Sequence, residues 1–196
     1  MLIVFLASSS VQAEAGERRV IHVYVALADN EHQGIVPVPA RLGNGSDPGN
    51  NLYWGALYGV KTFFRKSPHW ITVKTFDDPA QHVLERAVFR HREADVYLVA
   101  DAYRGSSIRL AIRDFINASA GRNGDSITMN SVSLPVAGNA DLIAYVGHNG
   151  LMDFDLPAVH SENNGKQTDI ILLACASRPY FKKILRTSGA NPLLWT

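Results

Sequence analysis

Two side chains capable of covalent catalysis follow two apolar runs in the second half of the chain. His148 comes shortly after the run 142–146, and Cys175, the only cysteine, directly follows the run 170–174. Apolar runs of this length between polar, glycine-containing segments predict strands buried on both faces of a parallel sheet. Because ligands bind beyond the carboxyl ends of such strands, the histidine and the thiol are expected to emerge at one edge, as a nucleophile and its general base require.

The order of these features resembles a known family. An apolar run leading to Gly147-His148, a spacer, and a second apolar run ending in Ala174-Cys175 is similar to the caspase-like cysteine peptidases, which include caspases, metacaspases, legumains, gingipains and clostripain. The segments 147–154 and 193–196 also look like a bacterial family with this fold. The resemblance implies an α/β fold, a three-layer α/β/α sandwich with a mostly parallel, caspase-like sheet. It further implies a cysteine endopeptidase with a dyad of His148 as general base and Cys175 as nucleophile.

The remaining site residues are assigned from the same resemblance. Backbone N–H groups at Cys175 and near Asn149 and Gly150 are expected to hold the oxyanion. Members of the family have Gly directly after the histidine, whereas Asn149 intervenes here. Asp29, at the end of the first predicted strand, is the candidate floor of a specificity pocket and would favour Arg or Lys before the cut. The competing interpretation is that Asp29 caps a turn.

Two other functions compete with the peptidase. A non-catalytic caspase-like binding or scaffold domain is favoured by the His-Asn-Gly sequence and by the short C-terminus. An unrelated doubly wound protein for a small ligand is the third hypothesis, but no G-x-G-x-x-G follows a strand and no Walker or G-x-S-x-G pattern is present. Asp153 and Asp155 near the histidine match no metal-ligand motif and are predicted to be surface or capping residues, so no metal and no cofactor is expected.

Composition limits the class of protein and its partners. The 196 residues are 46% hydrophobic with a formal net charge of +1, which favours one globular domain over 16–196. No run of like charges suggests nucleic acid, so the expected partner is a peptide or protein substrate. The oligomeric state is left open.

The N-terminus predicts export. Residues 1–15 read as a signal peptide, with an apolar start and a small residue at Ala13, although the positive n-region is missing and a buried N-terminal segment is the alternative. The apolar part is too short to span a bilayer, so the mature protein is expected in the periplasm or outside the cell without membrane insertion. A single cysteine excludes an intramolecular disulfide, and a lone thiol in an oxidising compartment favours a functional Cys175.

The elements that position the site follow from periodicity. Strands are expected at 20–27, 70–76, 95–100, 142–146 and 170–174, helices at 51–65, 79–91, 106–118 and 178–187, and a short hairpin around 127–129 and 132–134. The glycine- and proline-rich segment 31–50 is expected to be a long loop that walls the cleft. The chain stops soon after a new apolar run at 193–195. We therefore expect the C-terminal part of the family to be missing, as in a truncated reading frame.

Overall fold

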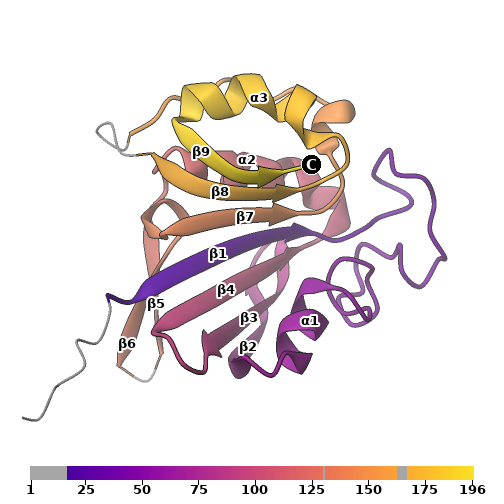
Figure 1. Ribbon diagram of the computed structural model, residues 1–196. Coiled ribbons are helices and arrows are strands. Elements are labelled where there is room, and N and C mark those ends of the chain that lie inside the picture. The colour runs from indigo at the N-terminus through magenta and orange to yellow at the C-terminus, as the bar shows by residue number, and fades with distance from the viewer. Residues whose placement is uncertain (1–16, 130, 163–166) are drawn as a thin grey trace, which may run out of the picture.

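A seven-stranded, mostly parallel sheet forms the centre of an α/β fold (Figure 1), in a computed structural model that describes residues 17–129, 131–162 and 167–196. The strand order is β2-β3-β4-β1-β7-β8-β9. The bounds are β1 Arg19–Ala26, β2 Trp70–Ala80, β3 Val83–His91, β4 Val96–Tyr103, β7 Leu142–Val146, β8 Thr168–Leu173 and β9 Ala190–Trp195. The expected signal peptide at 1–15 lies outside the described residues.

The parallel part of the sheet is built around the first strand. β1 pairs in parallel with β4 on one side and with β7 on the other, and β8 pairs in parallel with β7. The expectation of four parallel strands in one sheet is therefore confirmed. The apolar run at 193–195 belongs to β9, which pairs in parallel with β8 at the edge.

Helices pack against both faces of this sheet. α2 (Ile108–Ser119) and α3 (Ser177–Ser188) share one apolar cluster with side chains of β1, β7 and β8, whereas α1 (Val60–Lys66) joins the cluster on the opposite face. The expected hairpin is present as β5 (Asp125–Met129) and β6 (Val132–Val136), and it packs on β1, β3 and β4. Short 3-10 turns lie at Gly105–Ser107, Ala137–Asn139 and Gly150–Met152. None of the helices in the described ranges combines the length and the apolar content needed to cross a bilayer.

The prediction of a helix at 79–91 is wrong, because this segment contains the end of β2, a turn and the whole of the strand β3. β3 pairs antiparallel with both β2 and β4, so the segment 67–93 adds a hairpin rather than a strand and a helix. The apolar positions 83, 84, 87 and 88 imitate a helical stripe because β3 is buried on both faces. Pro79, which suggested a helix start, lies beside the left-handed Asp78 near the end of β2, where the pairing shifts register.

The helix predicted at 51–65 is only half correct, since α1 begins at Val60. Residues 51–59 form close-packed turns instead. A Cβ on Gly55 would lie 2.3 Å from the carbonyl oxygens of Pro48 and Gly49, and one on Gly59 would lie 2.4 Å from the backbone of Trp54. Glycine at both positions therefore allows the chain to double back where a helix would not fit.

A buried ionic cluster joins β1, β3 and β4. Arg86 donates two hydrogen bonds to Asp101, at 2.6 and 2.7 Å, and His22 Nε2 lies 3.1 Å from the same carboxylate. Burial opposes the charged form of Asp101, but the hydrogen bonds from Arg86 and His22 outweigh it and hold the pKa of Asp101 below its usual value. His22 Nδ1 also accepts the backbone N–H of Ala137, so this histidine is a structural residue.

Candidate functional site

The two candidate catalytic residues follow the ends of two paired strands, β7 and β8. Val146 is the last residue of β7 in register with β8, and its partner is Leu173. His148 and Cys175 each follow two residues later, in the turns beyond the last paired residues. Neighbouring strands lie about 4.8 Å apart. The two side chains therefore leave the same carboxyl edge from adjacent strands.

Asp153, which was not predicted to be a site residue, holds the histidine. His148 is 6% exposed, and its Nε2 lies 2.7 Å from Asp153 Oδ2. Because a carboxylate can only accept, Nε2 carries a proton, and in the neutral imidazole the lone pair is on Nδ1. Asp153 was expected to be a surface or capping residue. Its spacing of five residues across the turn at Gly150 was the available signal, although such spacing is common in loops.

Cys175 begins a strained connection to α3. Its side chain is exposed, and Ala176, the next residue and N-cap of α3, has the left-handed φ of 46°. A non-glycine residue in this region costs on the order of 1–2 kcal/mol. Such strain persists only where neighbouring groups fix the backbone, and it is frequent at functional sites.

Asn149 supplies that restraint. Its side chain is fully buried, and Nδ2 donates to the carbonyls of Cys175 at 2.9 Å and Ala176 at 3.3 Å. Its Oδ1 is a buried acceptor without a donor among the described residues. The residue that departs from the family pattern therefore links the histidine turn to the cysteine turn through its side chain, a contact that sequence alone did not suggest.

The backbone donors expected at the oxyanion site differ in availability. The N–H of Gly150 donates to the carbonyl of His148 at 3.0 Å. No acceptor among the described residues takes the N–H of Asn149 or that of Cys175. Of the N–H groups named from the sequence, these two have no acceptor among the described residues, and only Cys175 belongs to an exposed residue, because Asn149 is fully buried.

The long loop after β1 lies along this edge of the sheet (Figure 1). Its Gly34 N–H donates to Asp153 Oδ2 at 3.0 Å, so the loop contacts the carboxylate that holds His148. Burial raises the pKa of Tyr53, and its electrostatic interaction with Cys175 raises it further. Tyr53 was not identified as a site residue from the sequence.

Asp29 occupies a different place. Its Oδ1 accepts the backbone N–H groups of Glu31 and His32, and both carboxylate oxygens lie within 3.1 Å of His32 Nδ1. It lines a depression of about 280 Å³ formed by residues 29–32, 40 and 43–46, which includes neither His148 nor Cys175. The structure thus brings His148, Cys175, Asn149 and Gly150 together and sets Asp29 apart as a turn-capping residue.

The described residues form no metal-binding cluster at this edge. Among the described residues, no three histidine, cysteine or carboxylate side chains converge on a point where a metal ion could be held. His148 and Cys175 make no hydrogen bond with each other in this conformation, although both are described. Asp155, the other loop carboxylate, makes no ion pair with a described residue.

Removing the Asn149 side chain should loosen the cysteine turn. We expect Asn149→Ala to lower the free energy of unfolding by about 1–3 kcal/mol, because two carbonyls would lose their buried donor. Asn149→Asp should cost more, since a carboxylate would face those same oxygens. Urea unfolding monitored by circular dichroism measures both. Asn50→Ala, which removes the hydrogen bonds that Asn50 accepts from Arg41 and donates to Asp47 near the surface, is the control and should lower stability by less than Asn149→Ala.

Comparison with known proteins gives no relative. No family model, no curated protein and no solved structure matches this chain. The functional conclusion therefore depends on the residues and their geometry.

Proposed function

We propose that this protein is a cysteine endopeptidase with a caspase-like, three-layer α/β/α sandwich. The observation that carries the proposal is the parallel pairing of β7 and β8, which ends at Val146 and Leu173, two residues before His148 and Cys175 at the carboxyl edge of the sheet. Helices packed on both faces agree with the sandwich. Asp153, bonded to Nε2, would make the dyad into an Asp-His-Cys arrangement.

The mechanism uses the free nitrogen of the histidine. Nδ1 of His148 takes the thiol proton of Cys175, and the sulfur attacks the scissile carbonyl. The N–H group of Cys175, an exposed residue, stabilises the oxyanion, whereas that of the buried Asn149 contributes only if its turn opens when substrate binds. The imidazolium then gives its proton to the leaving amine, and the thioester that remains is hydrolysed by water, which His148 deprotonates.

Specificity and compartment complete the proposal. A preference for Arg or Lys would require a cationic side chain to replace the exposed His32 beside Asp29. Hydrolysis of peptides with Arg, Lys or Leu before the cut distinguishes this preference from a general one.

Export is proposed on the sequence of residues 1–15 alone. N-terminal sequencing of secreted material tests it.

Alkylation of Cys175 tests the proposal without a known substrate. If His148 accepts the thiol proton, iodoacetamide should modify Cys175 rapidly well below pH 8.5, about the pKa of an ordinary thiol. His148→Ala should abolish this low-pH reactivity, and Asp153→Asn should reduce it in part. His160→Ala removes an exposed histidine and should leave the profile unchanged. Identical profiles in wild type and His148→Ala would reject the pair.

That negative result would favour the second candidate function, a non-catalytic binding or scaffold domain. The observation in its favour is that His148 is buried and makes no hydrogen bond to Cys175. Contact in the resting state is not needed for catalysis, because catalytic hydrogen bonds can tighten only when substrate binds. The peptidase is therefore the better supported of the two.

A further inference from the structure

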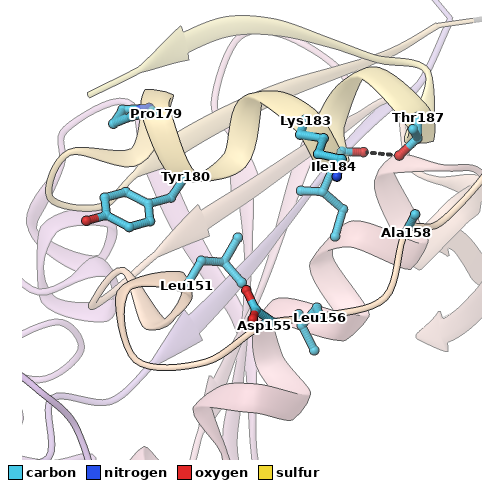
Figure 2. Close-up of a pocket in the computed structure, with 9 residues that line it drawn as sticks. All are labelled: Leu151, Asp155, Leu156, Ala158, Pro179, Tyr180, Lys183, Ile184 and Thr187. Carbon is cyan, nitrogen blue, oxygen red and sulfur yellow. Dashed lines mark hydrogen bonds between the residues drawn. The ribbon is translucent and has the colours of Figure 1, made fainter.

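A groove of about 580 Å³ lies between α3 and the segment 151–158 (Figure 2). Leu151 and Leu156 line it from the segment, and Ile184 lines it from the helix. Tyr180, at the N-terminal half of α3, is 44% exposed beside it. The groove is lined by apolar and polar side chains together and is large enough for a side chain of another molecule.

The exposed side of α3 carries a positive stripe, of which Lys183 lines the groove, whereas Lys182 and Arg186 line a neighbouring hollow that shares Lys183 with it. Arg178, Lys182, Lys183 and Arg186 are all exposed, and α3 contains no acidic residue. Across the described ranges of the chain, no carboxylate forms a salt bridge with any of these four side chains. The guanidinium carbon of Arg178 lies 5.7 Å from the centre of the Trp195 ring. The net charge of +1 is thus distributed with a local excess of cations on this helix.

The spacing of the stripe suits an extended peptide. Arg178, Lys182 and Arg186 follow one another at intervals of four residues, a rise of about 6 Å each along a helix. Alternate side chains of an extended chain are about 6.6 Å apart. A peptide with acidic residues at alternate positions can therefore place one carboxylate near each cation.

We propose that this surface binds an acidic polypeptide segment of a partner protein, with carboxylates along α3 and an apolar side chain in the groove. Asp155 lines the opposite wall and orients the segment, because it repels carboxylates from that side. A bilayer is the weaker alternative. The apolar residues Phe181 and Leu185 are buried in the protein core and cannot insert, and a flat surface would leave the groove unfilled.

The test uses the full chain and a fluorescein-labelled decapeptide that alternates glutamate with serine around one central leucine. Fluorescence anisotropy should show binding that weakens as salt is raised. Lys182→Glu with Lys183→Glu should weaken binding by about tenfold or more, and Asp155→Asn should tighten it about two- to fivefold. Arg90→Glu with Arg92→Glu, an exposed pair at the end of β3 toward the other edge of the sheet, is the matched control and should bind like wild type.

Several outcomes would overturn the proposal: no binding at millimolar peptide, equal binding of a glutamine-for-glutamate peptide, equal loss in the Arg90/Arg92 control, or weaker binding in Asp155→Asn. Binding to phosphatidylserine vesicles without binding to the peptide would replace it with a membrane surface. Circular dichroism of each variant excludes unfolding as the cause. The test is independent of the proposed peptidase activity, since it measures no reaction and alters neither His148 nor Cys175.

Discussion

Cys175→Ala is expected to abolish peptide hydrolysis while leaving the fold unchanged. Loss of the nucleophile of a catalytic unit reduces the rate by roughly 10⁴-fold or more. The side chain is exposed, so its removal opens no cavity in the core. The measurement is the rate of cleavage of fluorogenic peptides with Arg, Lys or Leu before the cut, together with the thermal unfolding temperature.

The controls separate chemistry from structure and from contamination. Asn149→Ala should reduce the rate through a displaced turn and also lower stability, whereas Cys175→Ala should change the rate alone. The alanine variant, purified in the same way as wild type, measures cleavage by contaminants. Cleavage by this variant at the wild-type rate would show that Cys175 is not the nucleophile.

The largest loss of stability is expected from Asp101→Ala. Side chains of Asp101 and His22 are 3% and 4% exposed, and Arg86 is 20% exposed. Removing the carboxylate leaves the guanidinium without its partner in a mostly buried place, which costs about 3–5 kcal/mol. Asp95→Ala breaks the half-exposed pair with Arg18 and should cost about 0–1 kcal/mol. Urea unfolding of the two variants measures this difference.

The stabilisation that Asp101 provides should decrease as the pH is lowered. Because the pKa of Asp101 is lower in the folded protein, its stabilising effect is complete above the unfolded value of about 4 and is lost as pH falls through the folded value. The stability difference between wild type and Asp101→Ala should therefore narrow below about pH 4. A difference that stays constant down to pH 2 would show that the ionised carboxylate is not what stabilises the cluster.

The parallel half of the sheet could be predicted from the sequence because each strand there is a continuous apolar run. The sequence also placed His148 and Cys175 at the ends of adjacent strands. β3 was misassigned because Glu85 and Arg86 are charged yet largely buried, Glu85 beside Lys61 and Arg86 on Asp101. Such pairing joins residues far apart in sequence, and no local pattern reveals it.

The sequence predicted His148 and Cys175, but it did not predict the side-chain contacts of Asp153 and Asn149 with the two turns that carry them. Asp153 reaches His148 through a loop whose path depends on contacts such as that of Gly34 with Asp153. Asn149 looked like a defect in a motif because its side chain acts across the sheet edge on another turn. Residue type and spacing predict strand ends well, but they do not predict how loops close over them.

The central position of β1 has a consequence for the order of folding. β1 is synthesised first among the strands, yet its two neighbours are contributed by segments about 77 and 121 residues later. The middle of the sheet therefore cannot assemble until most of the chain has left the ribosome. Pairing over such separations slows folding and leaves an apolar strand exposed in the meantime. The nascent chain should consequently depend on chaperones.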